Sequence, residues 1–383
     1  MTRSRRRGSD AAGARAAALP PAAQRRNACN ELWSAAEALL LRAEHAIRLL
    51  DRLMPQNGAA ERERLRVAYA RGEAPEAELR YAPRPSFAEL RRALTQLATQ
   101  LAHADPLSRE YAERALELET EAALVERAGT PELAVLAARR FDPAPLAGQQ
   151  QVSELVGAWL ASGSDPAEER IESDDARCPD SLVSLLRHAI GSRRLPVRVE
   201  VHRGLSAVAA AGDGVVAVRP GVLLAAAEAR RIVHHELEAH VMPRLAARSE
   251  ALGLFRTGCR GSGEHEEGRA LLLEERGGFL GAGRRRELAL RHRAAVLVRA
   301  GATLAEAVRA LRSDGAGTEQ AIELSLRAGR GGGLAREIVY LPAYLAVRAG
   351  FASEPELETM FRRGRVSLGA ARLLYSKVIT TGA

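Results

Sequence analysis

The segment from Val233 to His240 reads VHHELEAH and holds the residue types that a hydrolytic metal site needs. His235 and His240 flank Glu236 in the pattern His-Glu-x-x-x-His. Neutral imidazoles bind Zn²⁺, and a nearby carboxylate can take a proton from water on the metal. The same residues would also suit a solvent-exposed helix rich in His and Glu, so the pattern needs support from elsewhere in the chain.

The spacing of the two histidines is one residue longer than in the common zincin pattern His-Glu-x-x-His. Residues five apart in an ideal α-helix point roughly 140° away from each other. A single π-turn adds one residue to the helix and would return both imidazoles to one face. Small Ala239 and the helix-disturbing Pro243 favour such a distortion. We therefore predict a π-bulge between His235 and His240.

A second acidic segment, EHEEGRA from Glu264 to Ala270, can supply a third metal ligand. In zinc peptidases whose third ligand is a glutamate on a following helix, that residue often opens a Glu-Gly-x-Ala turn. Glu267 occupies this position, and Gly268 would let a neighbouring helix approach closely. Glu266 and His265 are competing ligands, because their side chains also coordinate metals.

With both motifs in place, the chain resembles the QEGLA-motif family, which includes the microtubule-associated tyrosine carboxypeptidases. The family carries His-Glu-x-x-x-His, a linker with glycine and phenylalanine, and then Glu-Gly-Leu-Ala. The linker here, ALGLFRTGCRGSGEH, is similar, and the segment REIVYL at 336–341 resembles the family's Lys-Asp-x-x-Tyr-Leu. The resemblance spans roughly residues 30 to 380. Two positions depart from the family pattern: Glu266, and Arg269, which replaces a leucine and is expected to alter the substrate pocket.

The resemblance implies a zinc-dependent carboxypeptidase that releases a C-terminal residue, aromatic in characterised relatives, from a peptide or protein. It implies His235, His240 and Glu267 as zinc ligands. It also implies Glu236 as the base that accepts a proton from zinc-bound water and later passes it to the leaving amine. The alternative is a non-catalytic regulatory or binding protein on the same scaffold, although the presence of all four residues argues against it.

Three further residues are candidates for substrate contacts. Tyr340 would stabilise the oxyanion opposite the metal, or it is a core tyrosine. Arg327 and Arg330 lie beside a glycine-rich turn and would clamp a terminal carboxylate, or they are solvated surface residues.

Composition favours a globular enzyme over a nucleic-acid or membrane protein. The net charge is +8, but the first 26 residues hold seven arginines and one aspartate, 7 − 1 = +6, which leaves the rest nearly neutral. A nucleic-acid partner is therefore not expected, because phosphate binding needs a basic folded surface. No apolar run is long enough for a membrane span. Cys29, Cys178 and Cys259 form neither a disulfide framework nor a zinc motif, which favours a cytoplasmic protein.

The hydrophobic pattern predicts an α+β protein, predominantly helical and zincin-like, with a small β-sheet beside the His-Glu helix. We expect a disordered basic tail at 1–28, a helical region at 29–162 and a catalytic region at 181–383, the last two forming one compact unit. The predicted helices are 30–54 with Asn30 as its cap, 87–104, 107–127, 131–140 and 150–160, and the predicted strands are 196–202, 205–210 and 215–219. An acidic, turn-rich boundary is expected at 163–180. The oligomeric state is not predicted.

Overall fold

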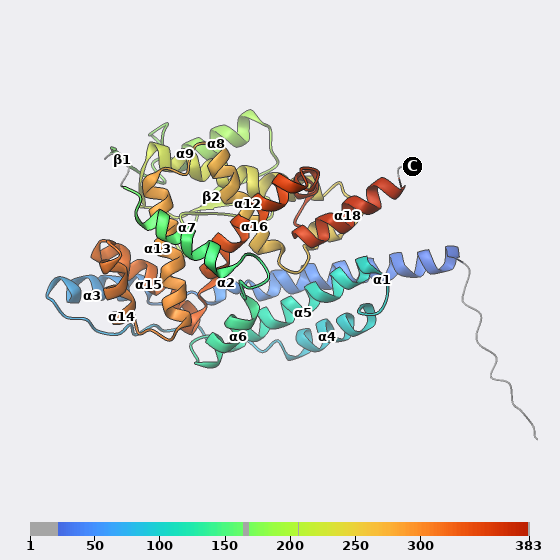
Figure 1. The fold of residues 1–383 in the computed structure, drawn as a ribbon, viewed down its shortest axis with the longest axis horizontal. Helices are drawn as coiled ribbons and strands as arrows, with labels where there is room; N and C mark the ends of the chain where they lie inside the picture. The colour runs from blue at the N-terminus through green and yellow to red at the C-terminus, as the bar shows by residue number, and fades with distance from the viewer. Residues whose placement is uncertain (1–21, 164–167, 206, 382–383) are drawn as a thin grey trace, which may run out of the picture.

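The computed structural model describes residues 22–163, 168–205 and 207–381. Most of these residues are helical, and the strands form two small sheets (Figure 1), so the α+β class and the helical character are confirmed. The predicted basic tail lies outside the described residues as far as residue 21, and helix α1 begins at Ala22. Within the described part of the chain, no helix is long and apolar enough to cross a membrane.

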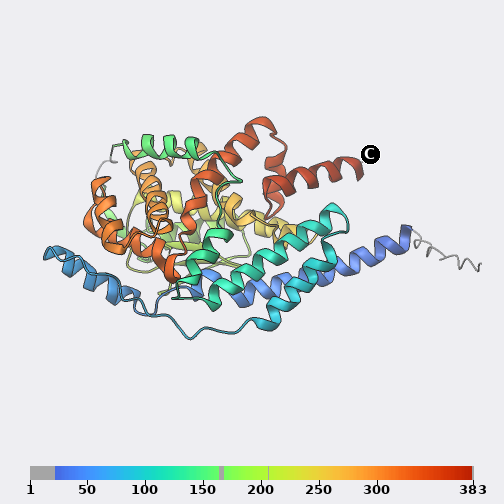
Figure 2. The same ribbon diagram turned by 60° about the horizontal axis from the view of Figure 1, so that its bottom comes forward.

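The N-terminal half is helical, and most of its helices lie along one side of the molecule, whereas the helix formed by residues 149–160 lies on the opposite side (Figure 2). Its helices are α1 (Ala22–Ile47), α2 (Leu49–Arg52), α3 (Gly58–Ala70), α4 (Ala88–Leu101), α5 (Pro106–Glu126), α6 (Glu132–Arg140) and α7 (Gln149–Leu160). Helix α5 begins where local chemistry favours it, because the Asp105 carboxylate accepts hydrogen bonds from the amides of Leu107 and Ser108 and Pro106 follows the cap.

Four of the five predicted N-terminal helices are confirmed to within three residues at each end, and the first is wrong at both ends. Helix α1 already includes Asn30, which is therefore not its cap. The helix stops at Ile47 because Arg48 adopts a left-handed conformation with φ of 41°. Leu49–Arg52 then forms the separate short helix α2, so a continuous apolar periodicity concealed a break.

The strands form two sheets next to the helix that carries the histidines. The strands are β1 (Arg170–Glu172), β2 (Arg198–Val201), β3 (Ala209–Ala211), β4 (Val215–Val218) and β5 (Leu223–Ala225). One sheet has the order β2-β4-β3, with β2 parallel and β3 antiparallel to β4, and the predicted hairpin turn at 212–214 joins β3 to β4. The other sheet pairs β1 with β5. Both of these strands were missed, since three-residue strands are too short to show an alternating pattern, and β1 lies within the expected turn-rich boundary.

The second half of the chain surrounds the His-Glu segment with helices (Figure 1). These elements are α8 (Leu182–Ser192), α9 (Ala226–His234), η1 (His235–Val241), α10 (Met242–Ala247), α11 (Leu254–Thr257), α12 (Ser262–Arg276), α13 (Ala282–Arg299), α14 (Leu304–Ser313), α15 (Thr318–Gly333), η2 (Arg336–Val339), α16 (Tyr340–Ser353), α17 (Leu357–Arg363) and α18 (Leu368–Thr381).

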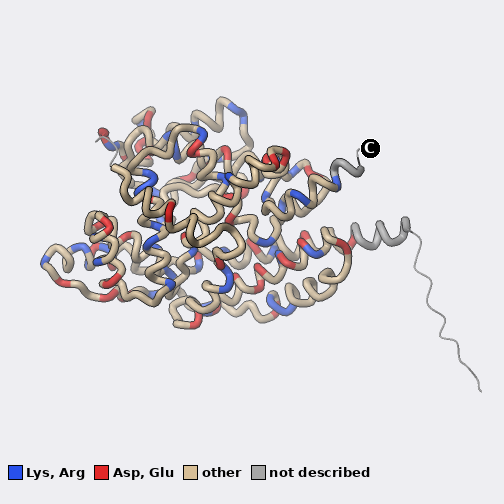
Figure 3. Tube along the Cα trace, viewed as in Figure 1, with Lys and Arg blue, Asp and Glu red and all other residues tan. Residues whose placement is uncertain are grey.

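Two apolar cores hold the site elements in place. The larger one joins the N-terminal layer to the second half of the chain, for example through Leu40 and Tyr111 on one side and Leu271 and Leu341 on the other. A smaller core packs α8 and α9 against the three-stranded sheet. The predicted domain boundaries remain predictions, but the large core spans both regions. Basic and acidic residues are interspersed over the folded part of the chain (Figure 3).

Candidate metal centre

The predicted π-bulge is present in the helix that carries the histidines. Helix α9 continues as the π-helix η1 (His235–Val241), in which the amide of Met242 donates to the carbonyl of Leu237, five residues back. The extra residue brings both imidazoles to one face. The Nε2 atoms of His235 and His240 are consequently only 3.3 Å apart.

Glu267 on helix α12 completes a group of three possible metal ligands. Its Oε2 lies 4.0 Å from Nε2 of His235. One ligand atom from each of His235, His240 and Glu267 lies within 4.8 Å of the other two, and the described residues contain no other group of three or more His, Cys, Asp or Glu side chains so arranged.

The two competing ligand candidates lie elsewhere. Oε1 of Glu266 is 2.9 Å from Nδ1 of His240, whereas Nε2 of the same ring faces His235. Nδ1 of His265 donates to the carbonyl of Gly261 at 2.8 Å, and this side chain lines a separate cavity with Glu264. Of the three candidates, Glu267 is the one that the fold brings to the two imidazoles.

A buried carboxylate orients His235. Oε1 of Glu274 is 2.7 Å from Nδ1 of His235, and the Glu274 side chain is completely buried. Burial alone would raise the pKa of Glu274, but Arg284, the His235 ring and Arg231 hold it well below its usual range. The ionised carboxylate accepts a hydrogen bond from Nδ1–H, which leaves the lone pair of His235 on Nε2, the atom that faces His240.

Glu266 plays the equivalent part for His240. Its carboxylate also forms an ion pair with Arg244, 3.0 Å from Nη1 to Oε1, and Nε of Arg365 lies 3.8 Å from Oε2. Burial would raise the pKa of Glu266, but Arg244 and His240 keep it well below its usual range. Burial would lower the pKa of His240, but Glu266, together with Glu236 and Glu267, raises it above its usual value. Each imidazole thus has a carboxylate on Nδ1, an arrangement that recurs in proteins around zinc-bound histidines.

The guanidinium of Arg336 orients Glu267, the third ligand candidate. A guanidinium nitrogen of Arg336 lies 3.5 Å from Oε1 of Glu267, which leaves Oε2 toward His235. The same guanidinium lies over the ring of Tyr340, 5.5 Å from its centroid. Burial raises the pKa of Tyr340 to about 12, so its hydroxyl stays protonated at neutral pH and can donate a hydrogen bond.

Glu236 links the histidine helix to the sheet. Its Oε2 accepts a hydrogen bond of 2.8 Å from the backbone amide of Ala211, the last residue of edge strand β3. The contact fixes the carboxylate beside the two imidazoles and places the strand along the site. The expected sheet beside the His-Glu helix is therefore present.

Gly268 explains how Glu267 reaches the histidines. A Cβ at this position would lie 2.5 Å from the carbonyl carbon and oxygen of Ala343 and 2.8 Å from the amide nitrogen of Tyr344. All three atoms belong to the backbone of α16, so only glycine allows α12 to pack this closely against it.

A cavity of about 860 Å³ opens over these residues and is lined by both histidines, Glu236, Glu267 and Tyr340. Arg327 and Arg330 line it too, but both face Glu337: Nε of Arg327 donates to its carboxylate at 2.6 Å, and Arg330 lies 3.8 Å away. The alternative interpretation, in which these arginines are solvated surface residues, is therefore wrong for both. A carboxylate clamp built from them would share their charge with Glu337.

The expectation for Arg269 is wrong. This side chain is not among the residues that line the cavity; it is buried and donates to the backbone carbonyls of Glu238 and Ala239. Cys259 is likewise buried, and its sulfur accepts a hydrogen bond from the amide of Ser367.

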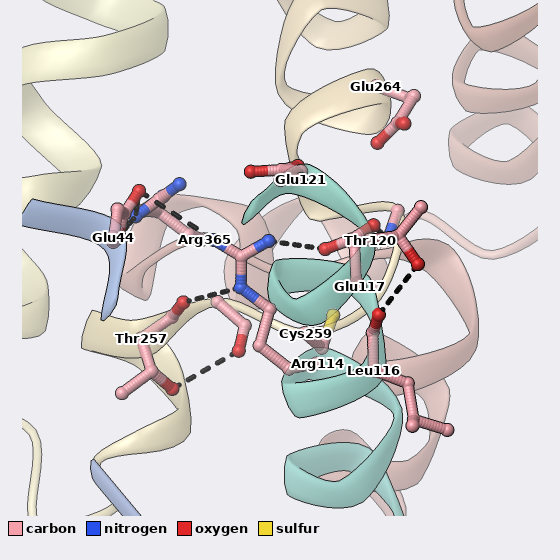
Figure 4. A network of polar contacts seen from close by, with 12 residues as sticks. Glu44, Arg114, Leu116, Glu117, Thr120, Glu121, Thr257, Cys259, Glu264 and Arg365 are labelled. Carbon is pink, nitrogen blue, oxygen red and sulfur yellow. Dashed lines mark hydrogen bonds and ion pairs between the residues drawn. The ribbon is translucent and has the colours of Figure 1, made fainter. Parts of the chain in front are cut away.

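A buried ionic network connects the site to the N-terminal helices (Figure 4). Arg365, next to Glu266, binds Glu44 of α1 at 2.7 Å. Glu44 also faces Arg114 of α5 at 3.7 Å, and Arg114 pairs with Glu117. The orientation of Glu266 therefore depends in part on helices far away in the sequence.

Sequence reasoning missed Glu274, Arg336 and the amide of Ala211. Glu274 follows Glu267 by seven residues, so helical periodicity places both on one face of α12 and was a usable signal. Arg336 opens the REIVYL segment that carries the family resemblance, but its contact with Glu267, like that of Ala211 with Glu236, arises only through tertiary packing.

Comparison with known proteins supports the resemblance. A family model described as microtubule-associated tyrosine carboxypeptidase matches residues 68–380, which is most of the chain. No curated protein matches the sequence.

Proposed function

The chain belongs to the microtubule-associated tyrosine carboxypeptidase family, and from this premise we propose that it is a zinc-dependent carboxypeptidase. Its substrate would be the C-terminus of a peptide or protein, with tyrosine, the residue in the family's name, as the first candidate for release. The observation that carries the proposal is the pair of imidazole Nε2 atoms 3.3 Å apart beside Glu267.

The donor set fits zinc. Two ligands held about 2.0–2.1 Å from a tetrahedral Zn²⁺ are about 3.3 Å apart, which matches the Nε2 separation. His235, His240 and Glu267 would hold the ion, and three protein ligands are typical of catalytic sites, which keep a position open. When bound, zinc acts as a Lewis acid and lowers the pKa of coordinated water.

Glu236 would perform the proton transfers. The Ala211 amide engages one carboxylate oxygen, and the second oxygen can accept a proton from the attacking water. Glu236 would then deliver this proton to the leaving amine. Tyr340 lines the same cavity in its protonated form and would donate its hydroxyl hydrogen to the carbonyl oxygen as negative charge develops there.

Edge strand β3 would align the substrate. The amide of Arg219 donates to Val208, and that of Gly212 donates to Val215, so alternate residues of this strand bond to β4. By the same alternation, Ala209 and Ala211 direct their backbone groups away from β4. The contact from Ala211 to Glu236 agrees with this register. An extended peptide would add to the outer edge of β3 and present its scissile bond to Glu236.

The test combines metal analysis with a peptide assay. We expect one zinc per chain in the wild type, loss of zinc in Glu267→Gln, and retained zinc without C-terminal release in Glu236→Gln. Glu275→Gln is the matched control, because Glu275 lies on the same helix but outside the cavity. Peptides ending in tyrosine, phenylalanine, glutamate and alanine would report the preference.

Two results would contradict the proposal. A wild-type protein without bound metal, or one that binds zinc but releases no residue from any peptide, would point to a binding protein on this scaffold.

A further inference from the structure

The π-turn between the histidines leaves backbone carbonyls short of donors. In the π-helix η1 each backbone amide donates to the carbonyl five residues earlier, whereas in the α-helix α10 it donates to the carbonyl four residues earlier. Pro243, the second residue of α10, has no N–H. Its missing hydrogen bond would have gone to Glu238 at the π spacing or to Ala239 at the α spacing.

Arg269 supplies donors to these two carbonyls. Its Nη1 lies 3.0 Å from the oxygen of Glu238 and 3.3 Å from the oxygen of Ala239. The side chain is 5% exposed, and none of the ion pairs among the described residues includes it. A buried cation is costly without compensation: Glu358, Glu266 and Glu238 favour its charge through space, and the two carbonyls are its direct hydrogen-bond partners.

The position of Arg269 couples the two halves of the metal centre. It belongs to α12, two residues after Glu267, and its partners belong to the segment between His235 and His240. A single side chain therefore ties the helix of the third ligand to the distorted turn that sets the separation of the first two.

We propose that Arg269 is a positioning residue that holds the π-turn open and keeps His235 and His240 in register with Glu267. The proposal rests on the metal centre of the proposed function. It predicts that loss of the guanidinium lets the turn relax and weakens metal binding, although Arg269 touches neither metal nor substrate.

The test compares Arg269→Met, which keeps side-chain length but removes the donors, with Arg269→Lys, which keeps a charge and donors. Arg299→Met is the matched control, because Arg299 also donates to two carbonyls, those of Ala137 and Phe141, away from the site. Zinc affinity would be measured by competition with a chelator, and site geometry by the visible absorption spectrum of the Co²⁺-substituted protein.

We expect Arg269→Met to lower zinc affinity about 10- to 100-fold, the range for residues that orient metal ligands, and to change the Co²⁺ spectrum. Arg269→Lys should lose less, and Arg299→Met should match the wild type. Unchanged affinity and spectrum in Arg269→Met, or an equal loss in Arg299→Met, would overturn the proposal. If Arg269→Met does not fold, the same comparison uses Arg269→Lys and Arg299→Lys, and equal affinities would overturn it.

A metal-free measurement separates this proposal from the proposed function. Amide hydrogen exchange at residues 240–242 should accelerate in Arg269→Met and not in Arg299→Met. If the wild type binds no zinc, the proposed function fails, while faster exchange still supports the bracing role of Arg269. Unchanged exchange refutes that role whether or not zinc binds.

Discussion

Replacing Gly268 with alanine is expected to destabilise the protein, although the same change usually stabilises a helix. Alanine in a helix interior is favoured over glycine by up to about 1 kcal/mol. Here the new Cβ would lie 2.5 Å from two backbone atoms of Ala343, whereas carbon atoms in contact normally stay about 3.5–4.0 Å apart. The helices α12 and α16 must therefore separate by about 1 Å. Overpacking of this kind costs about 1–3 kcal/mol.

The separation would also reach the metal centre, because Glu267 precedes Gly268 on α12 and moves with it. Gly157→Ala is the matched control: Gly157 lies within helix α7, and a Cβ there would meet no atom within 4 Å. Urea unfolding of the metal-free proteins would compare the two. We expect the midpoint to fall in Gly268→Ala and to stay or rise in Gly157→Ala, with zinc affinity reduced only in the former. A Gly268→Ala protein as stable as the wild type would refute this account of the helix contact.

Three further predictions concern charged and polar residues of the site. Glu274→Gln should lower zinc affinity about 10- to 100-fold in a chelator competition, because the anion that orients His235 is lost; an unchanged affinity would exclude this role. Tyr340→Phe should lower kcat about 100- to 1000-fold at unchanged zinc content, whereas a change in unfolding midpoint alone would identify a core tyrosine. Burial would raise the pKa of Glu337, but Arg327 and Arg330 lower it from 4.5 to about 2, so its ion pairs stabilise the fold above pH 4.5 and are lost toward pH 2. The stability difference between wild type and Glu337→Gln should therefore shrink over that range in pH-dependent thermal unfolding, and a constant difference would contradict the pairing.

Local patterns predicted much of the secondary structure near the site. The π-bulge followed from the helical angle between His235 and His240, because that geometry depends on the spacing of residues within one helix. The tight packing at Gly268 was likewise foreseen from a glycine beside an acidic residue. The end of helix α1 and the strand β1 were not predicted. The break at Arg48 depends on a left-handed backbone conformation, and β1 depends on pairing with the distant strand β5, and short windows of sequence encode neither.

The sequence by itself determined which residue types were available for chemistry and how they are spaced on each helix, since both properties are local. It left Glu266, Glu267 and His265 as alternative ligands, because the rotation of α12 against the histidine helix depends on packing between elements. Tertiary structure alone assigned Glu274 and Glu266 to the imidazoles, Arg336 to Glu267, and the Ala211 amide to Glu236. It also places Arg269, which was expected in the substrate pocket, against the carbonyls of Glu238 and Ala239 in the π-turn. These contacts join segments that lie 25 to 69 residues apart (236 − 211 = 25 and 336 − 267 = 69), and such pairings are set by the shared core rather than by any local pattern.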